Sequence, residues 1–331
     1  MDEWFLPAVK DWAEWAAIFT DVGLWRPVVD QVWQQDDRLR AASGINVPAR
    51  VESGYPGTCA VFVVDETAVI KFFPPMVARD FDRELAVYQL IHGRVARTPD
   101  LLAHGWFHDR IEWPYLVVSR LPGEAWREEA SRVETVQATV VMAELGRIIR
   151  AVHAIPLPTA GTWPAASAWE ALVTARLAQA GDDLRRGTVL AEPVIARIEL
   201  ELSRMSWYGD PVCLLHSDLT EDHLLVAEVG GRWSITGLID WADAEVGPAA
   251  YDWVTLWFSI CRRNSKHYRS FFRGYGPQAI VFGQQLAAMT YLHRFGANII
   301  GDVLSSEQQR AIGSLAKLNQ ALFGAPARTT P

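Results

Sequence analysis

The sequence has little cysteine and no long hydrophobic run, and each shortage excludes a class of protein. Cysteine occurs at only three of 331 positions, Cys59, Cys213 and Cys261, with no C-x-x-C pair among them. A disulfide framework and a thiolate zinc site are therefore excluded. Apolar residues make up 50% of the chain, yet no stretch approaches the roughly 18 uninterrupted apolar residues of a membrane-spanning helix. We therefore expect a soluble protein.

Basic residues are also in the minority. The chain has 31 lysines and arginines against 39 aspartates and glutamates, which gives a net charge of -8. A general nucleic-acid binder needs the opposite sign, so we predict no nucleic-acid partner. The chain begins MDEW, without the basic and apolar segments of a secretory signal. We therefore expect a cytoplasmic protein with no membrane partner; the sequence indicates no particular oligomeric state.

Tryptophan, by contrast, is abundant. It occurs 15 times, and five of these residues fall within the first 33 positions. Trp12, Trp15 and Phe19 are spaced i, i+3, i+7, which is helical spacing, and we predict two short helices between residues 8 and 36. We expect the face that carries Trp12 and Trp15 to pack against the domain that follows.

Beyond residue 36 the pattern changes from helical to strand-like. The runs AVFVV (60–64) and AVIKF (68–72), separated by the polar residues DET, predict a β-hairpin. Helical spacing follows over 80–92, and PYLVVS (114–119) predicts another buried strand. The first 120 residues therefore combine strands with one helix beyond the N-terminal pair.

The rest of the chain is mainly helical. Pro122-Gly123 is a breaker pair typical of a domain boundary. A wide apolar stripe from Val141 to Val152 predicts a core-facing helix. Short strand-like pieces lie between later helices, and Gly230-Gly231 predicts the turn of a hairpin between two of them. The later helices are expected over 167–186, over 190–206 and from Ala249 onward.

Two acidic segments, HSDLTEDH and IDWAD, follow short strands. Phosphoryl transfer needs one carboxylate that orients and deprotonates the acceptor hydroxyl, and further ligands that hold Mg²⁺ against the nucleotide phosphates. The kinase-type loop H-x-D-x-x-x-x-N supplies such groups. His216, Asp218 and His223 occupy its three positions. Asp240 takes the place of the second metal ligand.

A lysine and a glutamate upstream extend this pattern. Lys71 ends the strand AVIK, which matches the V-A-I-K motif whose lysine neutralises the nucleotide phosphates. Glu84 lies on the next predicted helix, where it could pair with Lys71. Each of these features alone is weak, but their order along the chain favours a nucleotide-dependent phosphotransferase.

The order of Lys71, Glu84, the HSDLTEDH loop and Asp240 resembles the aminoglycoside phosphotransferase and choline kinase superfamily. The segments VIKFF, WPYLVVSRLPGEAWRE, ELGRIIRAVHAIPL and TGLIDWADAEVG are most similar to the hygromycin B phosphotransferases, and the similarity runs from about residue 45 to 300. It implies an α+β, protein-kinase-like two-lobed fold, with a small β-rich N-lobe and a larger, mainly helical C-lobe. The expected divisions are an N-terminal helical extension (1–44), a nucleotide-binding N-lobe (45–120), a C-lobe with the catalytic and acceptor site (121–323) and a flexible tail (324–331).

The resemblance also implies a role for each matching residue. Asp218 would be the catalytic aspartate and Asp240 a magnesium ligand. Lys71, supported by Glu84, would hold the nucleotide phosphates. The segment from Ser119 to Leu121 would be the linker that offers backbone groups to the adenine. ATP and Mg²⁺ are therefore the expected cofactors.

Three further features are assigned supporting roles. The loop 53–58 lies where this superfamily places its phosphate-covering hairpin, but it lacks the full G-x-G-x-x-G pattern. His216 is expected to brace the catalytic loop through hydrogen bonds. Asp252 is expected to bind backbone amides rather than a ligand.

One position departs from the superfamily pattern, because His223 stands where Asn is usual and Asp222 precedes it. Imidazole is a poor ligand for Mg²⁺, which prefers oxygen. Three interpretations remain open. His223 could bind a softer ion such as Mn²⁺, Asp222 or water could supply the missing oxygen, or the site could be catalytically impaired. The presence of the other site residues favours the first two.

The acceptor is predicted to be a small and cationic molecule. Glu221, Asp222 and Asp243 could line a pocket for a polycationic substrate, or simply belong to a solvated loop. The predicted function is ATP-dependent phosphorylation of a hydroxyl, with an aminoglycoside such as hygromycin B as the first choice. Another alcohol acceptor (a choline-like amine, a sugar or a different antibiotic) and a nucleotide-binding pseudokinase are the alternatives. A metallohydrolase is a third class, which would leave Lys71 and Glu84 unexplained.

Overall fold

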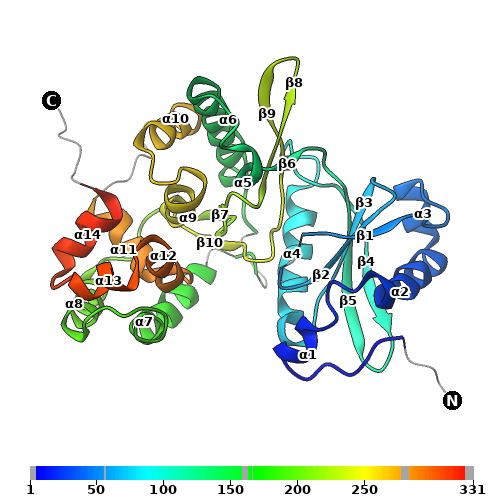
Figure 1. Ribbon diagram of the computed structural model, residues 1–331, viewed down its shortest axis with the longest axis horizontal. Coiled ribbons are helices and arrows are strands. Elements are labelled where there is room, and N and C mark those ends of the chain that lie inside the picture. The colour runs from blue at the N-terminus through cyan, green and yellow to red at the C-terminus, as the bar shows by residue number, and fades with distance from the viewer. Residues whose placement is uncertain (1–4, 56, 159–162, 166, 277–282, 325–331) are drawn as a thin grey trace. The chain divides into compact units, whose positions relative to one another are not determined.

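The computed structural model describes residues 5–55, 57–158, 163–165, 167–276 and 283–324, and the chain divides into two compact units (Figure 1). The first unit runs to Ala125 and regains the segments His223–Ala227 and Ile235–Ala244. The second contains Trp126–Asp222, Glu228–Ser234 and the chain from Glu245 onward. The N-terminal helices thus group with the first unit, and the predicted tail (324–331) lies outside the described residues except for Gly324.

A five-stranded antiparallel sheet organises the first unit. The strand order is β1-β2-β3-β5-β4. β2 and β3 pair from Ala60↔Phe72 to Val64↔Ala68, which confirms the predicted hairpin. β1 and β4 were not predicted from the sequence. The strands are β1 (Val51–Ser53), β2 (Ala60–Val64), β3 (Ala68–Phe72), β4 (Leu101–His108) and β5 (Glu112–Ser119).

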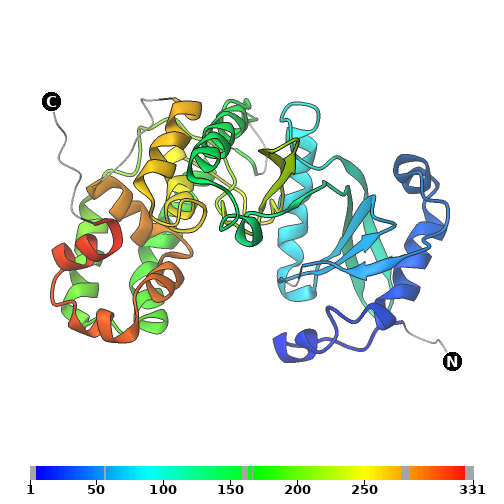
Figure 2. The same ribbon diagram turned by 45° about the horizontal axis from the view of Figure 1, so that its top comes forward.

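Helices cover both faces of this sheet. Figure 2 shows the sheet between α4 on one side and α2 and α3 on the other. The helices expected between residues 8 and 36 and over 80–92 are confirmed. The helices of this unit are α1 (Trp12–Ala16), α2 (Val22–Gln35), α3 (Asp37–Ser43), the 3-10 turn η1 (Pro75–Val77) and α4 (Ala78–Ile91).

An aspartate begins each of the first three helices. The side chain of Asp11 accepts hydrogen bonds from the Ala13 and Glu14 amides. Asp21 caps α2 and Asp36 caps α3 in the same way. Such caps satisfy amides that have no partner within the helix and favour negative charge at the positive end of the helix dipole. Local chemistry therefore sets where these helices start.

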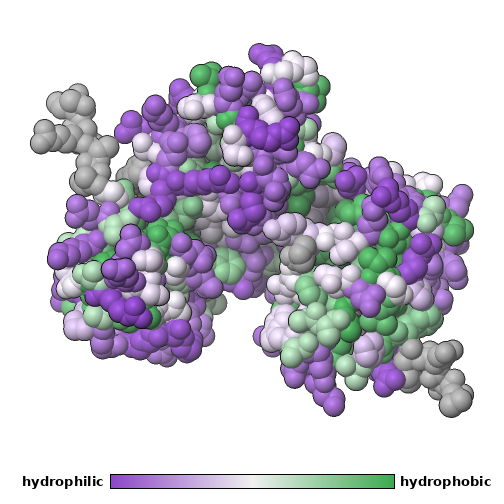
Figure 3. All heavy atoms as spheres, in the orientation of Figure 1, coloured by the Kyte–Doolittle hydropathy of each residue, from purple (hydrophilic) through white to green (hydrophobic). Residues whose placement is uncertain are grey.

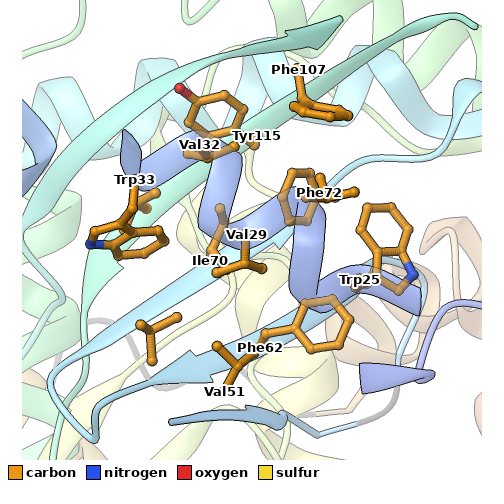
Figure 4. Packing of buried hydrophobic residues seen from close by; sticks show 14 of the residues in the cluster. Trp25, Val29, Val32, Trp33, Val51, Phe62, Ile70, Phe72, Phe107 and Tyr115 are labelled. Atoms are coloured by element: carbon orange, nitrogen blue, oxygen red, sulfur yellow. The ribbon is translucent and has the colours of Figure 1, made fainter. Parts of the chain in front are cut away.

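Aromatic side chains fill the core between α2 and the sheet (Figure 4). The Trp25 ring lies 4.8 Å from that of Phe72, and the Trp15 ring stacks on Trp113 at 5.8 Å. The predicted packing is therefore confirmed for Trp15. It is wrong for Trp12, which is 52% exposed, because α1 is short and presents only one side to the sheet unit.

The second unit is built mainly from helices, and α6 and α10 approach each other closely. A Cβ atom on Gly146 would lie 2.1 Å from the Phe271 carbonyl oxygen, so only glycine fits at this crossing. The helices predicted over 167–186 and 190–206 are confirmed. The α-helices are α5 (Trp126–Glu129), α6 (Thr135–His153), α7 (Ala168–Gly187), α8 (Glu192–Arg204), α9 (Asp252–Thr255), α10 (Ser265–Tyr275), α11 (Gln284–Leu292), α12 (Gly296–Val303), α13 (Ser306–Ala311) and α14 (Leu315–Phe323).

Short strands, one 3-10 turn and one π-helical turn lie next to the segments singled out for chemistry. β8 and β9 are joined at Gly230 and Gly231, both in the left-handed region with φ of 60° and 74°, which confirms the predicted turn. These strands form a sheet in the order β6-β8-β9, and β10 pairs with β7. The elements are β6 (Glu124–Ala125), β7 (Cys213–Leu215), β8 (Leu224–Val229), β9 (Arg232–Leu238), β10 (Glu245–Gly247), the 3-10 turn η2 (Ala249–Tyr251) and the π-helical turn η3 (Leu256–Ile260).

Among the helices that the structure describes, none is both long and apolar enough to cross a membrane. Hydrophilic residues cover most of the face shown in Figure 3. The architecture, a small antiparallel sheet unit and a larger helical unit, is the predicted α+β, protein-kinase-like fold.

Candidate active site

A lysine held between two carboxylates forms the centre of the site in the first unit. Lys71 projects from β3, and its Nζ lies 2.8 Å from Glu84 Oε2 on α4. The same Nζ lies 2.9 Å from Oδ1 of Asp240, which follows β9. The pairing of Lys71 with Glu84 that the sequence suggested is therefore present. Residues 71, 84 and 240, far apart in the sequence, meet through one ammonium group.

Burial and charge shift the pKa values of all three groups. Burial opposes the charge on Lys71, but Asp240 and Glu84 outweigh it and raise the pKa of the ammonium well above its ordinary value. Burial raises the pKa of Glu84 to about 7, although Lys71 favours the ionised form. Partial burial would raise the pKa of Asp240, but Lys71 and His223 hold it well below its ordinary value. Asp240 is therefore an anion at neutral pH. Glu84, by contrast, gains and loses its proton close to neutral pH.

The backbone holds Asp240 in an uncommon conformation. Its φ is 62°, in the left-handed region that few non-glycine residues occupy. The next residue, Trp241, is fully buried, and the Ala242 amide donates to Asp240 Oδ1 at 3.4 Å. The turn is thus fixed by the packing of Trp241, and a strained residue in such a fixed setting is often found at functional sites.

His223 is the nearest candidate for a second metal ligand in this unit. Its Nε2 lies 3.7 Å from Asp240 Oδ2. A carboxylate oxygen suits Mg²⁺, whereas imidazole suits softer ions. Within the described part of the chain, no group of three or more His, Cys, Asp and Glu side chains is arranged to hold a metal. Asp240 and His223 fit a cation that takes its other ligands from a nucleotide, and do not form a complete cage by themselves.

The catalytic loop predicted around Asp218 belongs to the second unit. His216 and Ser217 are fully buried, whereas Asp218 is only partly buried. Asp252 at the start of α9 accepts from the His216 amide at 3.1 Å and from the Ser217 amide at 2.7 Å. The prediction that Asp252 binds backbone amides is therefore confirmed. Its carboxylate fixes the chain immediately before Asp218.

His153 holds Asp252, and Tyr275 in turn holds His153; neither residue was predicted from the sequence. His153 Nε2 lies 2.9 Å from Asp252 Oδ2, and His153 Nδ1 lies 2.9 Å from the Tyr275 hydroxyl. Burial opposes the charge on His153, but the neighbouring Cys213 and Asp252 raise the pKa of the imidazole above its ordinary value. Their partners lie far away along the chain, so no local spacing could have indicated this role.

Two of the predicted acceptor contacts have arginine partners. Glu221 pairs with Arg127 Nη1 at 2.9 Å and with Arg262 Nε at 2.7 Å. Asp222 binds the same Arg127 guanidinium through both carboxylate oxygens. Asp243 is partly buried in the first unit. Glu221 and Asp222 would thus reach a cationic acceptor only by releasing Arg127, so their part in acceptor binding stays a prediction.

The linker predicted to contact adenine has most of its donors engaged. The Ser119 amide donates to the Asp100 carbonyl oxygen at 2.9 Å, and the Arg120 amide donates to the Thr67 carbonyl oxygen at 2.8 Å. Proline has no N–H group, so within the described stretch 119–122 the Leu121 amide is the donor that remains. If the linker binds adenine as predicted, the Leu121 amide is therefore the backbone donor, and carbonyl oxygens of the linker are the acceptors.

The glycine-containing loop before β2 is only partly described. Gly54 donates its amide to the Val61 carbonyl oxygen at 2.7 Å. A Cβ atom at Gly54 would lie 2.8 Å from Val61 Cγ1, so a side chain there would crowd the turn. Pro56 lies outside the described residues. The assignment of the loop 53–58 to phosphate covering stays a prediction.

Comparison with known proteins gives the chain a family. Residues 49–288 match the model described as "Phosphotransferase enzyme family". The GDP complex of aminoglycoside 2'-phosphotransferase-IIIa is similar, with a TM-score of 0.61, 15% identity and coverage of 88% of this chain and 97% of that one. The streptomycin–ATP complex of APH(2")-IIa has a TM-score of 0.56 and 14% identity, over 87% and 98% of the two chains. A putative aminoglycoside phosphotransferase from Ralstonia eutropha has a TM-score of 0.60 and 13% identity, over 89% and 96%.

Proposed function

Because the chain belongs to the phosphotransferase enzyme family, we propose that it transfers the γ-phosphoryl group of ATP to a hydroxyl of an aminoglycoside. The observation that carries this proposal is the double pairing of Lys71 with Glu84 and Asp240. A partly buried lysine, held by a carboxylate from α4 and by another that follows β9, is placed to exchange one of these partners for phosphate oxygens. A purely structural ion pair would need neither the third group nor its strained backbone.

Each site residue has a distinct part in the proposed reaction. Asp218 would accept the proton of the acceptor hydroxyl as its oxygen attacks the γ-phosphorus and the bond to the β-phosphate oxygen breaks. Lys71 would offset the negative charge of the phosphates, and Glu84 would keep its ammonium in place. The Leu121 amide would donate to the nucleobase.

Asp240 and His223 would hold a divalent cation at the phosphates. When bound, Mg²⁺ or Mn²⁺ would neutralise the charge of the nucleotide phosphates. Asp240 can serve because its carboxylate is ionised at neutral pH, and His223 lies close enough to contribute a nitrogen ligand. The neighbours solved with GDP and with ATP are consistent with a nucleotide at such a site.

The acceptor is proposed to be cationic. The net charge of -8 favours the approach of a polycation, and Asp243 is one of the carboxylates predicted to contact it. Kanamycin, gentamicin and streptomycin appear in complexes of structural neighbours. Hygromycin B remains our first choice because of the resemblance of the sequence segments, and a different alcohol is the alternative.

A nucleotide-binding pseudokinase is the second candidate, and one observation favours it. His223 replaces the usual asparagine and lies 3.7 Å from Asp240, where an imidazolium would compete with a cation for the carboxylate. A metallohydrolase has less support, because the described residues contain no cluster of three metal-ligating side chains and Lys71 and Glu84 would have no part in it.

The proposal is tested by measuring ADP release with Mg·ATP and Mn·ATP against a panel of aminoglycosides. We expect turnover that depends on the acceptor and is abolished by Asp218→Ala. Asp210→Ala, which removes an exposed aspartate earlier in the same unit, is the matched control and should leave turnover unchanged. Nucleotide binding without turnover across the panel would support the pseudokinase instead.

A further inference from the structure

Three side chains on one helical segment accept hydrogen bonds from backbone amides of the catalytic loop. Asp252 accepts from His216 and Ser217, as described above. Thr255 Oγ1 accepts from the Leu219 amide at 3.0 Å. Ser259 Oγ accepts from the Glu221 amide at 3.0 Å. Because these side chains stand at i, i+3 and i+7, they lie along one face of a helix.

Thr255 is the member of this series that acts next to Asp218. The amide before Asp218, that of Ser217, is held by Asp252 at 2.7 Å, and the amide after it, that of Leu219, is held by Thr255 at 3.0 Å. The backbone is therefore fixed on both sides of the proposed base. This segment cannot shift without breaking one of these two hydrogen bonds.

Burial makes the Thr255 hydrogen bond hard to replace. Thr255 is 3% exposed and Leu219 is fully buried, so no solvent reaches the Leu219 amide if the hydroxyl is lost. A buried N–H without a partner carries its whole desolvation penalty. The loop would then lower its free energy by shifting until the Leu219 amide can bind water, and Asp218 would shift with it.

The helix changes character at this point. Thr255 ends α9, and Ser259 lies in the π-helical turn η3. The Cys261 amide closes that turn by donating to the Leu256 carbonyl oxygen at 2.8 Å. Single π-turns inserted in helices are often found at functional sites. The widened turn carries Ser259, whose hydroxyl is the second of the two that accept from the loop.

We propose that Thr255 is a positioning residue for Asp218, with Ser259 in a weaker role further along the loop. The inference rests on the proposed function, because it assigns Thr255 a part in that reaction. Thr255 is 3% exposed and is given no direct contact with nucleotide or acceptor. It acts through the Leu219 amide, which sets the backbone from which Asp218 reaches the acceptor hydroxyl.

Thr255→Val tests the inference because valine keeps the shape of threonine and removes the hydroxyl acceptor. We expect kcat to fall by at least about tenfold, with KM for ATP within about twofold of wild type, because Lys71 and the linker are unaffected. Thr255→Ser restores the acceptor and should return kcat to within about threefold of wild type. If Thr255 had a merely structural role, kcat would fall equally in Thr255→Val and Thr255→Ser, or KM would change together with kcat.

Ser259→Ala tests the weaker role of Ser259 and should reduce kcat less than Thr255→Val does. Glu221 is also held by Arg127, whose own amide donates to the Glu221 carbonyl oxygen at 3.0 Å, so loss of the Ser259 hydroxyl should lower kcat by no more than about threefold. If Thr255→Val does not fold, Thr255→Ala removes the same hydroxyl without needing space, and it carries the same expectation. Thermal unfolding confirms that each variant assayed is folded.

Asp218→Asn separates failure of this inference from failure of the proposed function. If Asp218→Asn is inactive and folded Thr255→Val keeps wild-type kcat, the positioning role of Thr255 is overturned and the function stands. If Asp218→Asn keeps wild-type turnover, the assigned base is wrong, and the proposed function falls with the inference. An inactive Asp218→Asn, together with a tenfold loss in Thr255→Val and rescue by Thr255→Ser, supports both.

Discussion

Lys71 and Glu84 form a direct ion pair, with Nζ 2.8 Å from Oε2 and the glutamate only 2% exposed. Lys71→Met removes the charge proposed for the phosphates, so we expect kcat/KM for ATP to fall by about 100-fold or more. It also leaves Glu84 buried without its partner, which should cost about 3 kcal/mol in unfolding free energy. Steady-state kinetics and urea denaturation measure the two effects.

Lys10→Met is the matched control for this change, because Lys10 is an exposed lysine of the same unit. It should leave both kcat/KM and the unfolding free energy near their wild-type values. Equal losses in the two variants would show that Lys71 has no special part.

The pKa of Glu84 predicts how stability depends on pH. Its folded value of about 7 lies above the ordinary 4.5, so the folded protein holds a proton that the unfolded chain releases between these values. This contribution to the unfolding free energy is complete below pH 4.5 and is lost as pH rises to about 7, a change on the order of 3 kcal/mol.

Glu84→Gln isolates that contribution. The unfolding free energy of wild type minus that of Glu84→Gln should fall as pH rises across this window, and then level off. Urea denaturation of both proteins at several pH values measures it. A difference that does not change with pH would mean that folding leaves the pKa of Glu84 at its ordinary value.

His223 predicts a preference for Mn²⁺ over Mg²⁺. His223→Asn replaces a nitrogen ligand with an amide oxygen, so we expect the ratio of kcat with Mn²⁺ to kcat with Mg²⁺ to fall by about tenfold. Asp222 is bound by Arg127 through both oxygens, so Asp222→Ala should leave that ratio unchanged. A ratio altered by Asp222→Ala and not by His223→Asn would assign the missing ligand to Asp222.

The aromatic core of the first unit predicts a contrast between two tryptophans. Trp25 is fully buried against Phe62, Phe72 and Trp113, so Trp25→Ala should destabilise the protein by about 3–5 kcal/mol. Trp12 is 52% exposed, so Trp12→Ala should cost less than about 1 kcal/mol. Chemical denaturation of both variants gives the comparison, and similar costs would mean that α1 contributes more to the core than its exposure implies.

Local sequence patterns predicted the elements whose signals are local. The hairpin of β2 and β3 was found because its strands are β-branched and its turn is polar, and Gly230-Gly231 marked the other hairpin. β4 was missed, because LLAHGWFH contains a glycine and two histidines and becomes a strand by pairing with β5. Trp12 and Trp15 look equivalent by their spacing in the sequence. Trp15 is buried and Trp12 is exposed because the sheet unit covers only one side of α1.

The candidate site shows the same division. Lys71, Glu84, Asp218 and Asp240 were indicated by their order along the chain. His153, Tyr275, Thr255 and Ser259 were not, because their partners are a distant carboxylate or distant backbone amides and no spacing in the sequence encodes such contacts. The arginine partners of Glu221 and Asp222 were missed for the same reason, since Arg127 lies 95 residues away from Asp222.

The central claim is that this chain forms a phosphate ester on a cationic acceptor with Asp218 as the base. ³¹P NMR of a reaction of hygromycin B, ATP and the protein, with Mg²⁺ or Mn²⁺, tests it most directly. We expect a new phosphate monoester signal that grows in step with ADP and is absent with Asp218→Ala. An ester signal of equal size with Asp218→Ala, or no ester with hygromycin B or any other aminoglycoside, would contradict the account.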